Sequence, residues 1–173
     1  FNFAKNQKIA TRLFAGWGVP YGNSDVIPYS KQYFSGGPYS VRAFRTRSLG
    51  PGTFQPENSE TFSYYDQTGN LRLEANLEYR FPLISLLQGA VFVDAGNVWN
   101  TTDNEALEGD TFTSDFMNQL GIGGGFGMRV DIQNFVIRLD LAAPFHDPSL
   151  AEGQRWSWDF ENPILNFAIG YPF

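Results

Sequence analysis

The feature that most constrains the fold is an alternating run from Leu71 to Phe81, which reads L-R-L-E-A-N-L-E-Y-R-F. Every second residue from Leu71 onward is apolar, and the residues between them are charged or carry an amide. A strand places alternate residues on one face, whereas a helix would scatter these charges around its axis. About 9–11 residues is also the length that crosses a bilayer as a tilted strand. The run therefore predicts a transmembrane β-strand with one polar face.

Five further segments alternate in a similar way and are predicted to be strands. They are Lys8 to Gly18, Gly89 to Trp99, Phe116 to Asp131, Phe135 to Ala143, and Leu165 to the terminal Phe173. The connections alternate between long loops (residues 19–70, 100–115 and 146–163) and short turns (at Pro82 and at residues 131–134). Long extracellular loops and short periplasmic turns are typical of outer-membrane barrels. We predict an all-β chain whose six antiparallel strands belong to a transmembrane β-barrel.

The amino-acid composition excludes some classes of protein and favours β-structure. Hydrophobic residues make up 42% of the chain, but no apolar stretch approaches the roughly 18 residues of a transmembrane helix. The aromatic content of 17% and the 18 glycines favour β-structure. A net charge of −6 argues against nucleic acid as a partner, and the absence of cysteine excludes disulfides and thiolate sites. The alternative is a soluble β-sandwich, which usually has shorter strands and loops.

Six strands are too few to close a membrane barrel, because the smallest have about 8. The chain opens at Phe1 without a methionine or a secretory signal. We therefore expect residues 1–173 to be part of a longer protein, or to assemble with another copy.

Four motifs carry a resemblance to a known family. Residues 36–44, G-G-P-Y-S-V-R-A-F, resemble the V-R-G-F motif of the sixth extracellular loop in the BamA/TamA superfamily, with Ala43 in place of glycine. Residues 92–96, F-V-D-A-G, are similar to the family's F-x-D-x-G strand motif. Residues 76–83 resemble the strand that follows the loop, and residues 167–173 resemble the terminal β-signal. The chain thus looks like the C-terminal barrel region of a BamA/TamA-type assembly factor, a member of the bacterial surface antigen superfamily.

This resemblance implies a function and a location. Full-length members have about sixteen strands, and POTRA domains and the first strands would precede this part of the barrel. The resemblance implies assembly and insertion of proteins in the outer membrane of a Gram-negative bacterium. The implied partners are the lipid bilayer, nascent outer-membrane proteins or a translocated client, and accessory envelope proteins. A two-partner secretion pore is the alternative, and a structural porin or an outer-membrane hydrolase are less favoured ones.

The resemblance also implies a contact between the long loop and the barrel wall. Alternation places Glu78 on the polar face of its strand and Asp94 on the face that holds Phe92. A long loop carrying Arg42 can fold into the lumen and offer these carboxylates its guanidinium fork. In the family the corresponding arginine docks on the aspartate. The expected loop–lumen latch comprises Val41, Arg42, Phe44, Glu78, Phe92, Asp94 and Gly96.

The terminal strand carries the second expected site, a signal and a weak seam between the first and last strands. Its residues are Phe167, Ile169, Gly170, Tyr171 and Phe173. An imperfectly paired terminal strand is an exposed edge that can template an incoming strand. Gly170 weakens local packing and Pro172 cannot donate to the ladder, so both fit such a seam.

A glycine-rich stretch, G-I-G-G-G-F-G at residues 121–127, lacks the G-x-G-x-x-G spacing of a dinucleotide-binding loop. Glycines at every second position (121, 123, 125 and 127) leave one strand face bare. Such a bare stripe inside a barrel leaves space for an inserted loop or for the close approach of another backbone.

No cofactor, metal or catalytic site is expected. His146 is the only histidine, and without cysteine it cannot build the usual zinc sites. The hydrolase motif G-x-S-x-G does not occur. His146 with Asp147 or Ser149 would be the only candidate for an enzyme.

Overall fold

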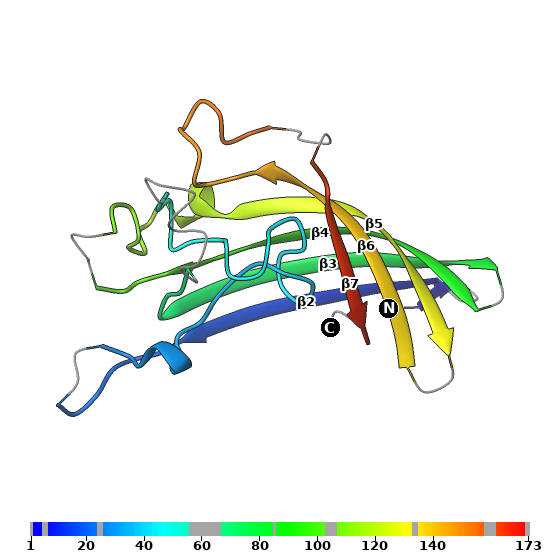
Figure 1. The fold of residues 1–173 in the computed structure, drawn as a ribbon, viewed down its shortest axis with the longest axis horizontal. Coiled ribbons are helices and arrows are strands. Elements are labelled where there is room, and N and C mark those ends of the chain that lie inside the picture. The colour runs from blue at the N-terminus through cyan, green and yellow to red at the C-terminus, as the bar shows by residue number, and fades with distance from the viewer. Residues whose placement is uncertain are drawn as a thin grey trace.

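The computed structural model describes residues 2–4, 7–23, 26–55, 67–84, 86–102, 107–132, 135–157 and 162–171. They form one antiparallel sheet in which each strand pairs with its neighbours in sequence order (Figure 1). The strands are β1 (Asn2–Ala4), β2 (Gln7–Trp17), β3 (Leu71–Ile84), β4 (Leu87–Trp99), β5 (Gly121–Ile132), β6 (Phe135–His146) and β7 (Ile164–Ile169). The predicted all-β fold with six consecutive antiparallel strands is confirmed, and the short β1 is an addition that the sequence did not reveal.

Two short 3₁₀ helices, η1 (Tyr29–Lys31) and η2 (Phe116–Gln119), lie in the loops. In the described part of the chain, no helix is long and apolar enough to cross a bilayer.

The two faces of the sheet have the polarity of a membrane barrel. On the outer face, Leu13 is 86% exposed and Phe126 is 63% exposed. On the inner face, Glu78, Asp94 and Asp140 are fully buried. A soluble sandwich packs its apolar residues inward, whereas a transmembrane barrel turns them toward lipid and keeps a polar interior. This inverted pattern favours the barrel over the sandwich.

The long connection between β2 and β3 folds back over the inner face. Two antiparallel bridges join separate parts of this connection, one between Tyr33 and Gly69 and one between Ser35 and Leu49. Figure 1 shows its cyan part lying across the sheet. Four side chains from this loop pack with Phe92 of β4 and Ala142 of β6 in one buried cluster; the four are Val41, Ala43, Phe44 and Leu49. We call residues 35–49 the inserted loop.

The predicted strand from Phe116 to Asp131 begins too early. Phe116 lies in η2, and β5 begins only at Gly121. The ring of Phe116 packs against Phe112 and edge-on against Trp99, with centroid distances of 5.3 and 6.4 Å. This aromatic cluster above the sheet fixes the chain in a turn before the strand starts.

The last two strands also differ from the prediction at their ends. β6 continues past Ala143 to His146, whereas β7 ends at Ile169. Gly170 then adopts a φ of +98°, which favours glycine, and its amide donates to the carbonyl of Val136. The predicted continuation of the strand through Tyr171 is therefore wrong, and the predicted positions Pro172 and Phe173 lie outside the described residues.

Tyr171 turns toward the inner face instead of continuing the outward-facing row. Its ring lies over the guanidinium of Arg80, 4.4 Å from Cζ to the ring centroid. Its hydroxyl donates to Asp131 over 3.3 Å. The positive φ at Gly170 reverses the side on which the next side chain lies, which strand alternation alone does not anticipate.

Candidate functional site

A tight turn presents Arg42 to the sheet. Gly36 and Gly37 have φ values of +96° and +99°, and the amide of Gly37 donates to the carbonyl of Phe44 over 2.9 Å. The amide of Phe44 in turn donates to the carbonyl of Val41 over 3.1 Å. A side chain on Gly36 would overlap the carbonyl of Arg45, so glycine is required there. The turn thus holds residues 40–43 against the strands.

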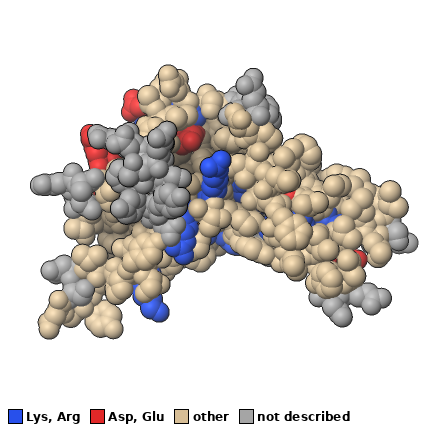
Figure 2. Space-filling model, in the orientation of Figure 1, with Lys and Arg blue, Asp and Glu red and all other residues tan. Residues whose placement is uncertain are grey.

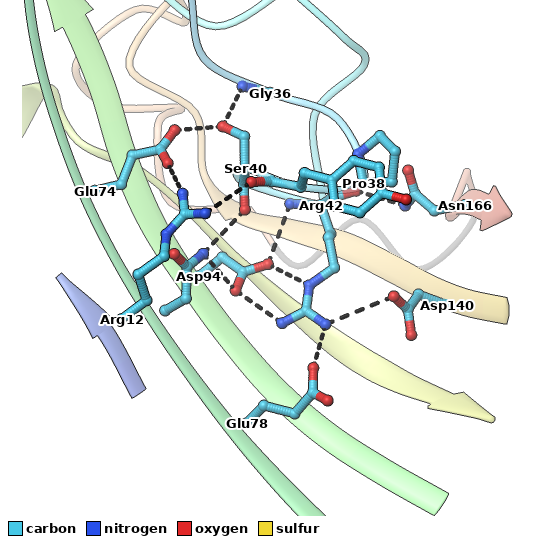
Figure 3. A network of polar contacts seen from close by, with 12 residues as sticks. Arg12, Gly36, Pro38, Ser40, Arg42, Glu74, Glu78, Asp94, Asp140 and Asn166 are labelled. Carbon is cyan, nitrogen blue, oxygen red and sulfur yellow. Dashed lines mark hydrogen bonds and ion pairs between the residues drawn. The ribbon is translucent and has the colours of Figure 1, made fainter. Parts of the chain in front are cut away.

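Arg42 grips Asp94 of β4 with both branches of its guanidinium (Figure 3). Nε donates to Oδ2 over 2.7 Å, and Nη2 donates to Oδ1 over 2.9 Å. The backbone amide of Arg42 adds a third bond to Oδ2 over 3.1 Å. Because both side chains are at most 1% exposed, water does not compete for these bonds.

Two further groups hold the same guanidinium. Nη1 donates to Glu78 Oε2 of β3 over 2.5 Å, and Cζ lies 3.5 Å from the ring centroid of Phe92. Burial by itself lowers the pKa of Arg42, but the hydrogen bonds and charges of Asp94 and Glu78 outweigh it, so the pKa is raised. Arg42 therefore stays charged at any physiological pH. Arg42, Asp94 and Glu78 are thus the three charged members of the predicted latch.

The latch is part of a larger buried ionic network that runs on to β5 and β6. Arg129 of β5 donates to Glu78 over 3.0 Å and to Asp140 over 2.5 Å. Asp140 of β6 lies 3.0 Å from Arg138 and 3.6 Å from Arg42. Arg80 donates to Glu78 over 2.7 Å. Removing one member of such a network leaves a buried charge unbalanced, which is costly.

A second polar group anchors the head of the inserted loop. Glu74 of β3 accepts hydrogen bonds from Ser35 and Ser40 of the loop, and from Arg12 and Arg72 of the wall. Asn76 of β3 donates one bond to the Ser40 carbonyl and one to Asp94, each over 2.9 Å. The loop is therefore held by a continuous set of polar contacts rather than by a single ion pair.

The other predicted latch positions supply its apolar surroundings. Val41 is fully buried, and Phe44 and Phe92 are 7% and 2% exposed. A side chain on Gly96 would press on Glu74, 2.7 Å from its Cγ, and on Val41, 3.1 Å from its Cγ2. The structure thus brings all seven predicted latch residues together around the docked loop.

The bare glycine stripe has two roles. Gly121 and Gly123 lie under the inserted loop, where added side chains would meet Leu49 and Ala43. Gly125 and Gly127 instead abut β6, at Leu141 and Asp140. The predicted space for a loop is thus provided by the first half of the stripe.

Side chains on β5, β6 and β7 complete the site and were not among the predicted site residues. They are Arg129, Arg138, Asp140 and Asn166, together with Tyr39 in the loop. Their signal was present in the sequence, since Arg138 and Asp140 alternate with apolar residues as inner-face positions do. The partners of these side chains depend on the order of the strands in the sheet, so the sequence pattern could not predict them.

Figure 2 shows several basic side chains on the face that carries the inserted loop, with acidic side chains on the same face. A cavity of about 390 Å³ lies between the inserted loop and the wall formed by β2 and β3. Its lining includes Arg12, Arg72, Phe14 and Phe34. Both of these arginines are paired with the buried Glu74.

His146 lies at the end of β6 rather than in a loop. Its Nδ1 is 2.6 Å from the carbonyl oxygen of Leu120, and its ring packs on Trp156. Ser149 donates its hydroxyl to Asp147, not to the histidine. Within the described residues, no three acidic, histidine or cysteine side chains are grouped to hold a metal.

Comparison with known proteins agrees with this geometry. Residues 1–172 match the model of the Omp85 superfamily domain. Over 124 residues the chain is 29% identical to the outer membrane protein assembly factor BamA of Neisseria meningitidis serogroup B, which covers 61% of this chain and 15% of that protein. The crystal structure of BamA from Haemophilus ducreyi lacking POTRA domains 1–3 has a similar fold, with a TM-score of 0.60 at 21% identity, over 95% of this chain and 31% of that one. The chain therefore spans a small part of the relatives it matches.

Proposed function

Because this chain belongs to the Omp85 superfamily, we propose that it supplies the last strands and the lumenal loop of an outer-membrane protein assembly factor of the BamA/TamA type. Its work is to help nascent barrel proteins fold and insert into the bacterial outer membrane. The chemistry is non-covalent: no bond is made or broken, and the protein acts by templating strands.

The observation that carries this proposal is the docking of Arg42 on Asp94 and Glu78. A fully buried guanidinium that makes bidentate bonds fixes the inserted loop firmly inside the sheet. In a plain diffusion porin we would expect no dedicated partner for Arg42. An assembly factor, in contrast, needs a braced wall beside a terminal strand that can open.

The terminal strand fits the opening role. β7 has six residues, whereas its partner β6 has twelve, so half of the edge of β6 is not covered by β7. Beyond Ile169 the chain turns inward at Gly170. A short strand with an early turn offers few ladder bonds to a neighbour and can exchange partners with an incoming strand.

The proposed assembly includes parts beyond this chain. Residues 1–173 would be the C-terminal region of a barrel whose first strands and POTRA domains precede it. Accessory envelope proteins and the outer-membrane bilayer would be its partners, since the Neisseria relative is an outer membrane protein assembly factor.

Reconstitution of the full-length parent in lipid vesicles tests the proposal. Urea-denatured outer-membrane protein is added, and its folding is followed by the gel shift that heating abolishes. We expect the parent to accelerate folding, Asp94→Asn to lose most of the acceleration, and the exposed control Asp115→Asn to keep it. Equal folding rates with and without the parent would overturn the assembly role.

The same preparation separates the alternatives. Export of one cognate protein without acceleration of barrel folding would identify a two-partner secretion pore. Passive flux of small solutes alone would identify a porin. A hydrolytic activity that disappears in His146→Gln would identify an enzyme.

A further inference from the structure

The inserted loop is bonded to the terminal strand as well as to the opposite wall. The amide of Asn166, in β7, donates to the backbone carbonyl of Arg42 over 2.9 Å (Figure 3). The hydroxyl of Tyr39 donates to the carbonyl of Ile169, the last residue of β7, over 2.7 Å. One loop segment therefore joins the latch on β3 and β4 to both the middle and the end of β7.

From these contacts we infer that Tyr39 and Asn166 are positioning residues through which the docked loop holds the terminal strand on the sheet. Release of the latch then frees β7 to change partners. The inference rests on the proposed function for its biological meaning, and it stands on the geometry for its structural content.

The length of β7 makes this support important. Its register with β6 comprises six residue pairs, from Ile137–Ile169 to Ala142–Ile164. In the described part of the sheet, β7 pairs with β6 alone. The two hydrogen bonds from the loop therefore add substantially to the short β6–β7 pairing that holds β7 on the sheet.

The position of the two bonds also matters. Asn166 is 8% exposed, so its side-chain amide is largely shielded from water while the loop is docked. Tyr39 binds immediately before Gly170, where the chain leaves the strand. The loop therefore holds β7 at its buried middle and at the point where it would begin to peel away.

A third hydrogen bond holds the same loop segment on the strand next to β7. Arg138 of β6 donates to the carbonyl of Pro38 over 2.6 Å, so the same segment is also held by the strand beside β7. A loop fixed on β3, β4 and β6 is a rigid support, and β7 is the short element that depends on it.

Hydrogen exchange of the full-length parent in nanodiscs tests the inference. Peptides covering residues 164–170 report on β7, and peptides covering residues 71–84 report on β3 as an internal reference. Tyr39→Phe removes only a hydroxyl and is paired with Tyr21→Phe, since Tyr21 is 91% exposed. Asn166→Ala is paired with Asn118→Ala at an exposed position.

In Tyr39→Phe we expect β7 amides to exchange about fivefold faster, which is the effect of losing about one net hydrogen bond. β3 and both control variants should be unchanged. Asp94→Asn should accelerate β7 as well, and adding Tyr39→Phe to it should change little more, because the loop has already been released.

Unchanged β7 exchange in both Tyr39→Phe and Asn166→Ala would overturn the inference, as would an equal rise in β3. Tyr39→Phe keeps the test decisive if Asn166→Ala fails to fold. Because exchange is measured without a client, failure of the proposed assembly activity would leave this result standing, and the two failures are distinguishable.

Discussion

Gly123 of β5 lies directly beneath Ala43 of the inserted loop, and a methyl group on Gly123 would overlap the methyl that Ala43 carries. The family motif that the loop resembles has glycine where this chain has Ala43. The extra methyl is accommodated here because the strand below has no side chain. The methyl group of Ala43 in the loop therefore fits the space that the missing side chain of Gly123 leaves on the strand.

Filling that space should prevent the loop from docking. We expect Gly123→Ala to lower the stability of the folded parent by about 1–3 kcal/mol, the usual cost of overpacking a tight contact. The measurement is the urea concentration at which the heat-modifiable gel band disappears. Gly153→Ala is the control, because nothing lies within 4 Å of the added carbon there. Adding Ala43→Gly should recover only part of the loss, because the added carbon would also lie 2.8 Å from the carbonyl oxygen of Ala143. No recovery would contradict the contact with Ala43.

Arginine at position 42 should not be replaceable by lysine. Lysine keeps the charge but loses the planar fork that binds both oxygens of Asp94. We expect Arg42→Lys to cost about 1.5–3 kcal/mol in the same urea assay, the range for lost hydrogen bonds to a charged group. The exposed Arg45→Lys should have no effect. Equal midpoints for the two variants would refute the need for bidentate binding.

The two halves of the latch should act as one unit. Arg42→Ala and Asp94→Ala should each cost about 3–5 kcal/mol, because each leaves a buried charge unbalanced. The double variant should cost clearly less than the sum of the two, since removal of both partners leaves no orphaned charge in this pair. A complete double-mutant cycle by urea unfolding measures the difference. Additive costs would mean that the residues act independently.

Glycine at position 170 should be needed for the inward turn. Its φ of +98° strains any other residue, by about 1–3 kcal/mol. We therefore expect Gly170→Ala to displace Tyr171 from Arg80, which a loss of protection in hydrogen exchange at residues 164–171 would report. Gly22→Ala, at a φ of +74° in the first long loop, is the matched control and should leave this region unchanged. Unaltered exchange in Gly170→Ala would show that the turn tolerates a side chain.

The alternation of side chains alone predicted most of the sheet. In β3, Glu74, Glu78 and Arg80 were expected on a polar face, and all three are buried on the inner face. Local pattern failed where neighbours outside the strand decide. Phe116 alternates correctly with Leu120, yet it packs into an aromatic cluster with Trp99 and lies in a helical turn.

Some residues of the candidate site could likewise be predicted from the sequence, and others could not. The motif positions Arg42 and Asp94 are visible in sequence through a resemblance, and the structure brings them together. No sequence motif marks the hydrogen bonds of the Asn166 amide and the Tyr39 hydroxyl, because a single side-chain hydrogen bond produces no periodic pattern in the sequence. Such contacts join residues 124 and 130 positions apart, and only folding brings them into range.

The sequence by itself determined that this chain forms long strands with an apolar outer face and a polar inner one, because the two-residue period of a strand is a local property. It also determined which loop carries the buried arginine. Only the tertiary structure decided which side chains extend the buried ionic network to β5 and β6, which glycines make room for the loop, and how the loop reaches the last strand. Those outcomes depend on strand order and register, which set distances between residues that no local pattern relates.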